Sequence, residues 1–152
     1  MALRVIGHGD PRLMTYGDYL GAVTTEQRNR VLSQATAVLM PTQYIEPFGN
    51  VSAEAQLCGT PVISTDMGGF VESVEQGVTG YRCNTLGEFV QAVDLAPLLD
   101  RASIRARAER LYGCEAADAA YRSYFRRLDT VRGEAWRDMT PSLQVCAEGV
   151  LV

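Results

Sequence analysis

The sequence predicts an α/β fold in which helices cover both faces of a Rossmann-like parallel sheet. Short apolar runs of strand length alternate with segments of helical periodicity along most of the chain, a pattern typical of strand–helix–strand units. Loops rich in glycine or proline follow several of these runs. In such folds a ligand binds in the crevice outside the carboxyl ends of the strands. With 152 residues, a single such domain is expected.

The elements can be assigned in order from composition and spacing. Strands are predicted at residues 3–6, 19–23, 37–40, 62–64 and 81–83. Helices are predicted from residue 24 onward and at residues 50–57, 86–99, 102–112 and 115–128. Thr24 and Gln27 can form a capping box at the start of the first helix.

The same patterns predict which side chains are buried. Residues 37–40 are expected to form a buried parallel strand. Helical spacing turns one group of residues inward, namely Val31, Leu32 and Ala35 in the first helix and Phe89, Val90 and Val93 in residues 86–99. In residues 115–128 the corresponding inward group is Ala119, Tyr121 or Ala120, Tyr124 and Phe125.

The stretch at residues 46–63 organises the chain as a loop, a short helix, a stop and a strand. Residues 50–57 are good helix formers without a breaker, and Gly49 or Asn50 can cap the helix start. Gly59 stands where a left-handed residue would close the helix. The helix is therefore expected to have about two turns.

Two glutamates flank the start of this helix. Its first N–H groups and the positive end of its dipole attract an anion such as phosphate. Glu46 lies on the approach loop and Glu54 about one turn into the helix, so both carboxylates can border one pocket. Carboxylates repel phosphate, but they accept hydrogen bonds from sugar hydroxyls. The pattern therefore favours a phosphorylated sugar or nucleotide.

Glu46 and Glu54 are separated by seven residues, and Cys58-Gly59-Thr60-Pro61-Val62-Ile63 follows them. This arrangement resembles the E-x7-E signature of retaining GT-B glycosyltransferases, family 4 of glycosyltransferase group 1. The resemblance covers roughly residues 3–128 and is to the C-terminal donor-binding domain, one half of the GT-B fold. It implies transfer of a hexosyl group from a nucleotide-diphosphate sugar to an acceptor hydroxyl, with retention of configuration.

The resemblance also implies roles for individual residues. Glu46 would lie against the donor sugar and act as the catalytic residue, and Glu54 would bind the nucleotide ribose. The alternative is that both are solvated acids on a surface helix. The expected donor-binding residues are Glu46, Phe48, Gly49, Asn50, Glu54, Gly21, Val23, Gly68 and Gly69.

Two of these groups carry open alternatives. Gly21, Ala22 and Val23 match the family's strand end that borders the nucleobase, and the alternative is an ordinary strand end. Gly68 and Gly69 would permit a close backbone approach to a ligand, and the alternative is a plain turn before the next helix. Tyr44 either covers the site or fills space in the loop.

Composition excludes several classes of function. The chain has no lysine and a net charge of −4, so it can supply neither a Walker-type nor a Schiff-base lysine, and nucleic acid is not the expected partner. The four cysteines and the single histidine, His8, lack the spacing of a zinc site. We expect no metal, no cofactor and no disulfides, the cysteines being small buried residues in a reducing, cytoplasmic compartment.

Residues 1–131 are expected to form the nucleotide-sugar-binding domain, and residues 132–152 a tail. Seven arginines between residues 101 and 127 form a basic stretch. It could meet a membrane surface or a partner protein, but pairing with nearby acids is favoured. Nothing else in the sequence supports membrane association.

In the family, an Arg and a Lys on earlier elements clamp the diphosphate, and a second domain binds the acceptor. Neither has a counterpart in this sequence, so we expect a partner domain on another chain, or a homo-oligomer. Two functions remain open: part of a transferase, or a non-catalytic nucleotide-sugar-binding module or truncated gene product. Domain closure positions the acceptor and excludes water, so the chain alone is expected to bind donor weakly and transfer sugar poorly.

Overall fold

A computed structural model describes residues 2–13 and 16–137. They divide into two compact units that meet between Tyr112 and Gly113, and each unit is considered by itself. The predicted border between residues 131 and 132 falls inside the helix of the second unit, α6 (Cys114–Arg137). Most of the predicted tail lies outside the described residues.

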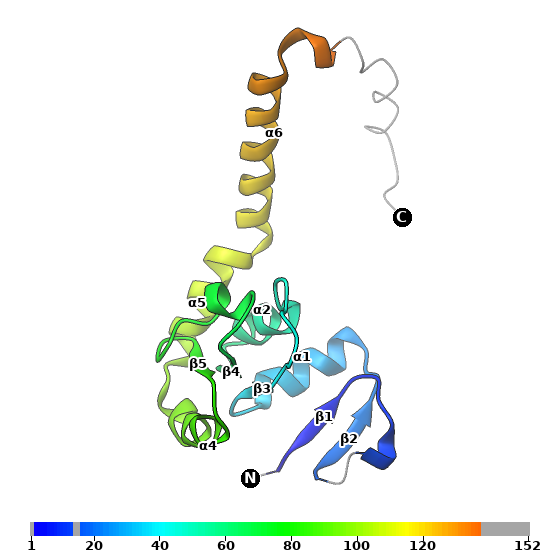
Figure 1. Cartoon of the computed structure of the whole chain (residues 1–152), viewed down its shortest axis with the longest axis vertical. Coiled ribbons are helices and arrows are strands. Elements are labelled where there is room, and N and C mark those ends of the chain that lie inside the picture. The colour runs from blue at the N-terminus through cyan, green and yellow to red at the C-terminus, as the bar shows by residue number, and fades with distance from the viewer. Residues whose placement is uncertain (1, 14–15, 138–152) are drawn as a thin grey trace. The chain divides into compact units, whose positions relative to one another are not determined.

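The first unit alternates strands and helices, as predicted (Figure 1). Its strands are β1 (Arg4–Ile6), β2 (Asp18–Gly21), β3 (Val38–Met40), β4 (Val62–Thr65) and β5 (Gly80–Cys83). Its α-helices are α1 (Thr25–Gln34), α2 (Asn50–Leu57), α3 (Phe70–Ser73), α4 (Leu86–Leu95) and α5 (Arg101–Tyr112), with short 3-10 helices at Pro11–Leu13 and Ala96–Leu98. All the strand pairings are parallel, β1 with β2 and, in a second sheet, β3 with β4 and β4 with β5. The predicted α/β class is therefore confirmed.

Strand β4 is the centre of the core. Val62 packs on one face with Leu32 of α1, Ala55 of α2 and Phe70 of α3. Its neighbour Ile63 points to the opposite face, because successive side chains of a strand alternate. There it packs with Cys83 of β5 and with Ala92 and Ala96, in α4 and the turn after it. Helices thus cover both faces of this sheet.

Strand β3 is less buried than predicted. Its residues are half-buried or exposed, and Leu39 is 39% exposed. The reason is its position: among the described strands β3 pairs with β4 alone, so it is the edge of its sheet. An apolar run of three or four residues does not distinguish a central strand from an edge strand.

Helix α4 turns most of the predicted stripe inward, with Val90 as the exception. Phe89 and Val93 are half-buried as expected, but Val90 is 59% exposed. The buried positions are Ala92 and Ala96, four residues apart on one face. Phe89 and Val93 pack on the same core cluster as these alanines, so the predicted face is right for them and wrong for Val90.

The aromatic residues of α6 were predicted to be buried, and this is wrong. Tyr121, Tyr124 and Phe125 are 66%, 57% and 58% exposed. They pack on one another, with ring centroids 6.5 Å apart for Tyr121–Phe125 and 5.7 Å for Tyr124–Phe125. The described part of this unit is one helix, which offers the rings no second element to pack against.

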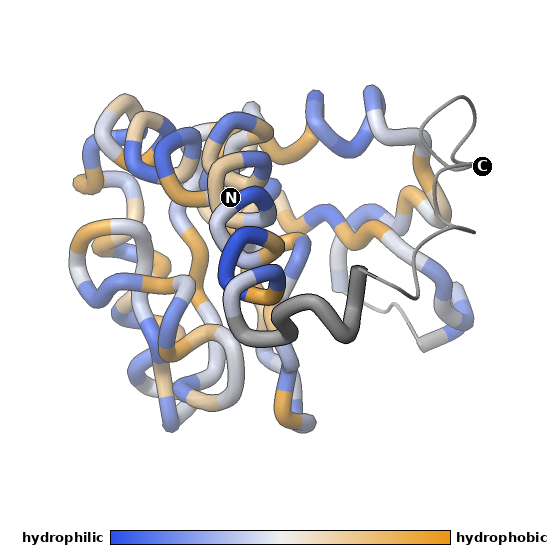
Figure 2. Tube along the Cα trace, turned by 90° about the horizontal axis from the view of Figure 1, so that it is seen from above, coloured by the Kyte–Doolittle hydropathy of each residue, from blue (hydrophilic) through white to orange (hydrophobic). Residues whose placement is uncertain are grey.

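The described cysteines differ in burial. Cys83 is buried and Cys58 half-buried, and burial raises the pKa of both thiols, whereas Cys114 is exposed, contrary to expectation. These three are unbridged, and Cys146 lies outside the described residues. Within the described chain no helix combines the length and apolarity that a membrane span requires, and polar residues interrupt the apolar ones throughout (Figure 2).

Helix ends follow the predicted local chemistry. The Thr24–Gln27 capping box is present at the start of α1. At the end of α2, Gly59 adopts φ +71°, its N–H donates to the carbonyl of Gln56 (2.8 Å), and the Thr60 N–H donates to that of Ala55 (2.8 Å). This is a Schellman motif, which satisfies carbonyls that a helix end leaves free.

Arg101 joins three segments that are distant in sequence. Its guanidinium donates to the carbonyls of Ala35 (2.6 Å) and Ser33 (2.7 Å) and to the hydroxyl of Thr60 (2.9 Å). It therefore holds the end of α1 beside the turn that follows α2. Sequence reasoning grouped Arg101 with the other arginines and missed this role.

Several of the other arginines pair with acids, as favoured. The pairs are Arg105–Glu109 (2.8 Å), Arg107–Glu75 (2.6 Å) and Arg122–Asp118 (2.7 Å). Exposed pairs of this kind contribute little to stability.

We expect Gly59→Ala to destabilise the first unit more than Gly77→Ala. Both glycines have nearly the same left-handed backbone, φ +71° and +72°, which costs an alanine about 1–2 kcal/mol. A Cβ at Gly59 would also lie 2.8 Å from the carbonyl oxygen of Arg101, whereas nothing lies within 4 Å of one at Gly77. Urea unfolding of both variants measures the difference, and equal losses would show that the contact with Arg101 does not matter.

Candidate functional site

The first part of the site is the loop between β3 and α2, which carries Glu46. One carboxylate oxygen, Oε1, accepts a hydrogen bond from the Gly49 N–H (3.1 Å). The other, Oε2, accepts from the Tyr44 hydroxyl (2.8 Å). The pKa of Tyr44 is raised because its neutral hydroxyl donates to this carboxylate. Tyr44 is exposed, so its contact with Glu46 fixes the carboxylate without filling buried space.

The second part is the loop between β4 and α3, which lies directly against the first. The Gly69 N–H donates to the carbonyl oxygen of Glu46 (2.6 Å). A Cβ at Gly68 would lie 2.5 Å from that same oxygen, and one at Gly69 would lie 2.7 Å from the Cα of Phe48. The close approach seen at the glycine pair is therefore to the Glu46 loop of the protein itself. Their contact with a ligand stays a prediction.

Helix α2 begins where these two loops meet. Gly49 is its buried N-cap and Asn50 its exposed first residue. As at any helix start, the first N–H groups lack partners in a preceding turn, and the dipole makes this end attractive to an anion. Phe48 lies on the surface beside it, edge to face with Tyr112 at 5.9 Å.

A buried polar cluster holds α2 against α3. The Gln56 side-chain amide donates to the carbonyl of Ser73 (2.9 Å) and to the hydroxyl of Ser52 (3.2 Å), and all three residues are buried. Directional hydrogen bonds in a buried place fix the relative position of two helices. The helix carrying Glu54 is thus fixed relative to the glycine loop.

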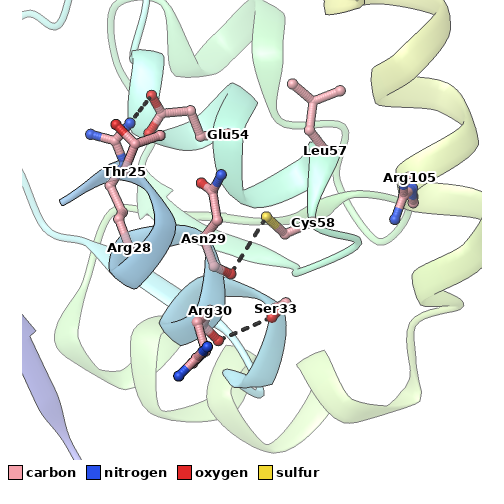
Figure 3. A pocket seen from close by; sticks show the side chains of 9 residues that line it. All are labelled: Thr25, Arg28, Asn29, Arg30, Ser33, Glu54, Leu57, Cys58 and Arg105. Carbon is pink, nitrogen blue, oxygen red and sulfur yellow. Dashed lines mark hydrogen bonds and ion pairs between the residues drawn. The ribbon is translucent and has the colours of Figure 1, made fainter.

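Glu54 faces α1 and pairs with Arg28 (Figure 3). The Arg28 Nη2 donates to Oε1 of Glu54 at 2.8 Å, and the two side chains are 34% and 31% exposed. The pair borders a surface depression of about 660 Å³ between α1 and α2. It is lined by Thr25, Arg28, Asn29, Arg30, Ser33, Glu54, Leu57, Cys58 and Arg105. Glu46 is not among them, so the expectation that both carboxylates border one pocket does not hold for this depression.

Two atoms of the Arg28–Glu54 pair are buried without a hydrogen-bond partner. They are Nε of Arg28, a donor, and Oε2 of Glu54, an acceptor. An unsatisfied buried polar group typically costs about 1–3 kcal/mol, and more when it is charged. Unsatisfied buried atoms of this kind are uncommon in native proteins and require an explanation.

The predicted nucleobase segment leads into this depression. Gly21 ends β2, where its carbonyl accepts from the Gly7 N–H (2.9 Å), and Val23 is half-buried. Thr25, two residues further on, lines the depression. Neither Gly21 nor Val23 lines the depression. The predicted contact of this segment with a nucleobase stays a prediction.

Arg28 was missed by sequence reasoning, although a signal was present. It stands four residues before buried Leu32 and seven before half-buried Ala35. These positions share one helix face, so Arg28 is a charged residue on the inward stripe of α1. A charge in that position needs a partner, and Glu54 supplies it.

Comparison with known proteins identifies the family. The family model described as glycosyl transferases group 1 matches residues 2–100. The chain belongs to this family. Glycogen synthase of Mycobacterium tuberculosis is 33% identical over 102 residues, which are 65% of this chain and 24% of the relative. D-inositol 3-phosphate glycosyltransferase of Mycobacterium leprae is 42% identical over 66 residues, or 42% and 15% of the two chains. The chain thus spans a quarter or less of these curated relatives.

Solved structures of the same class resemble the fold. AviGT4, a glycosyltransferase involved in avilamycin A biosynthesis, is 28% identical with a TM-score of 0.66, over 84% of this chain and 43% of that one. Anabaena HepE in complex with UDP-glucose is 20% identical with a TM-score of 0.60, over 79% and 40%. The predicted family resemblance is therefore confirmed at the level of group 1 glycosyltransferases.

Among the described residues no cluster of three or more metal-ligating side chains occurs.

We expect Gly69→Ala to loosen the two loops that meet at Glu46. Its backbone suits alanine, but the added Cβ would lie 2.7 Å from Phe48 and push the loops apart. Hydrogen exchange of the amides in residues 41–49 should become faster. Gly87→Ala, whose Cβ would have its nearest neighbour at 4.0 Å, is the control and should change nothing there. Unchanged exchange in both variants would contradict the interlock.

Proposed function

We propose that this chain is the donor-binding domain of a retaining glycosyltransferase of the family-4, E-x7-E type. It transfers a hexosyl group from a nucleotide-diphosphate sugar to an acceptor hydroxyl. The observation that carries the proposal is the start of α2, an anion-attracting helix end with Glu46 before it and Glu54 within it. The complexes of HepE with UDP-glucose and with UDP and glucose support a nucleotide sugar as the donor.

In this proposal Glu46 binds the sugar. Each of its oxygens already accepts one hydrogen bond, from Gly49 or from Tyr44. A carboxylate oxygen has a second acceptor position, which is free for a sugar hydroxyl. Because the two existing bonds hold the carboxylate in place, it is pre-oriented for that contact.

The phosphates are held by the protein backbone. The first N–H groups of α2, from Asn50 onward, and the positive end of its dipole bind the diphosphate without a metal ion. Departure of the diphosphate leaves an oxocarbenium-like centre on the sugar, which Glu46 and the leaving phosphate stabilise electrostatically. The donor-binding region lies within residues 1–131.

The test is a panel of nucleotide sugars added to the purified chain. Ligand-observed NMR measures binding, and donor hydrolysis or transfer is followed in the same samples. We expect weak binding that falls with added salt, because phosphate contacts are electrostatic. Little or no turnover is expected of a donor-binding half alone. Rapid turnover by the purified chain would overturn the half-enzyme interpretation, and no binding to any nucleotide sugar or free nucleoside diphosphate would refute the proposal.

We expect Glu54→Ala to weaken binding of a free nucleoside diphosphate more than Glu46→Ala does. A free nucleoside diphosphate contains the ribose but not the donor hexose, so only the Glu54 variant loses a contact with it. That contact is a hydrogen bond to a charged group, worth about 1.5–3 kcal/mol. Calorimetry decides between the two residues. Glu75→Ala breaks a comparable ion pair with Arg107 away from the site and is the control. Equal losses for Glu46 and Glu54 would reject this assignment of roles.

A further inference from the structure

The Arg28–Glu54 pair is incompletely bonded in a specific way. One contact joins Nη2 to Oε1 at 2.8 Å, while Nε of Arg28 and Oε2 of Glu54 are buried and have no partner. The pair therefore lacks one acceptor and one donor. A hydroxyl group is both, because its hydrogen can donate to a carboxylate and its oxygen can accept from a guanidinium.

We infer that Arg28 is a positioning and specificity-determining residue, which orients Glu54 so that the pair together reads the vicinal hydroxyls of the nucleotide ribose. The inference rests on the proposed function, in which Glu54 binds the ribose. It adds to that function a second residue from a different helix, α1. A ribose diol supplies the donor and the acceptor that the two buried atoms lack.

The geometry gives Arg28 this role because of what surrounds Glu54. Glu54 is half-buried on helix α2 between buried Ala53 and Ala55, and the contact with Arg28 is its one ion pair among the described residues. Both unpartnered atoms are covered, so the two side chains must rotate to meet a ligand. Their partial exposure, 34% and 31%, and the adjoining depression of about 660 Å³ leave room for this movement.

Arginine suits this position because its N–H donors are held in one rigid plane. Its planar fork can hold a carboxylate through one nitrogen and present another donor alongside. Lysine has the same charge but lacks that fixed geometry. The charge-retaining variant Arg28→Lys therefore separates the effect of charge from that of shape.

The experiment compares ribonucleotides with their deoxy forms. Full-length chain is titrated with UDP, ADP and GDP and with the 2′-deoxy and 3′-deoxy form of each, by ligand-observed NMR. For the nucleotide that binds best, removal of the critical hydroxyl should weaken binding by about 10- to 100-fold, the value of a hydrogen bond to a charged group. In Arg28→Met this ratio should fall to about 3-fold or less, and in Arg28→Lys it should lie between the two.

The control is Arg107→Met, which breaks the pair with Glu75, also formed by a half-buried arginine (27% exposed) and lying outside the depression. It should leave the ratio at its wild-type value. If Arg28→Met weakens both forms equally and keeps the ratio, Arg28 is merely structural and the inference is wrong. Circular dichroism checks folding, and Arg28→Lys carries the test if Arg28→Met does not fold.

The failure of the proposed function gives a different result. If wild-type chain shows no preference for the ribonucleotide and Glu54→Gln behaves identically, then Glu54 does not bind ribose and the proposed role of Glu54 fails with it. If wild type discriminates, Glu54→Gln loses the discrimination and Arg28→Met keeps it, the proposed function stands and only the role of Arg28 is overturned.

Discussion

The candidate site depends on the close contact between two backbone segments. The carbonyl of Glu46 receives the Gly69 N–H at 2.6 Å, and side chains at Gly68 and Gly69 would collide with residues 46–48. Because the two loops leave neighbouring strands, β3 and β4, this contact sets where the following helices begin. The buried hydrogen bond from the Gln56 side chain to the Ser73 carbonyl then joins α2 to the end of α3. The backbone of Glu46 is therefore held by the backbone of the neighbouring loop, whereas its carboxylate is held by Tyr44 and the Gly49 N–H.

Features that depend on neighbours in sequence were predictable. The capping box at Thr24 and the left-handed turn at Gly59 each involve residues within a few positions, so composition and spacing were sufficient to predict them. Burial was predicted less well. Leu39 is exposed because β3 is the edge of its sheet, and Val90 because Ala92 and Ala96 face the core instead. The burial of each residue depends on partners that lie far away along the chain.

The same distinction applies to the site. The sequence indicated Glu46 and Glu54 through their spacing. The family comparison shows membership of group 1, and the roles of the two glutamates stay predictions. It did not indicate which residues hold them. Tyr44 lies two residues from Glu46, within reach of local patterns, whereas Arg28 lies 26 residues before Glu54 and meets it only in the folded chain. The charge on the inward face of α1 is a signal that Arg28 needs a partner, but it does not identify which acid.

Arg101 has a consequence for how the domain is delimited. The match to the family model ends at residue 100, yet the next residue donates three hydrogen bonds to Ser33, Ala35 and Thr60. A piece of the chain cut at the limit of family similarity would leave the end of α1 without this donor. The segment that the family model matches is thus shorter than the segment whose contacts hold α1 beside the turn after α2. Anyone transplanting this domain into another protein should carry α5 with it.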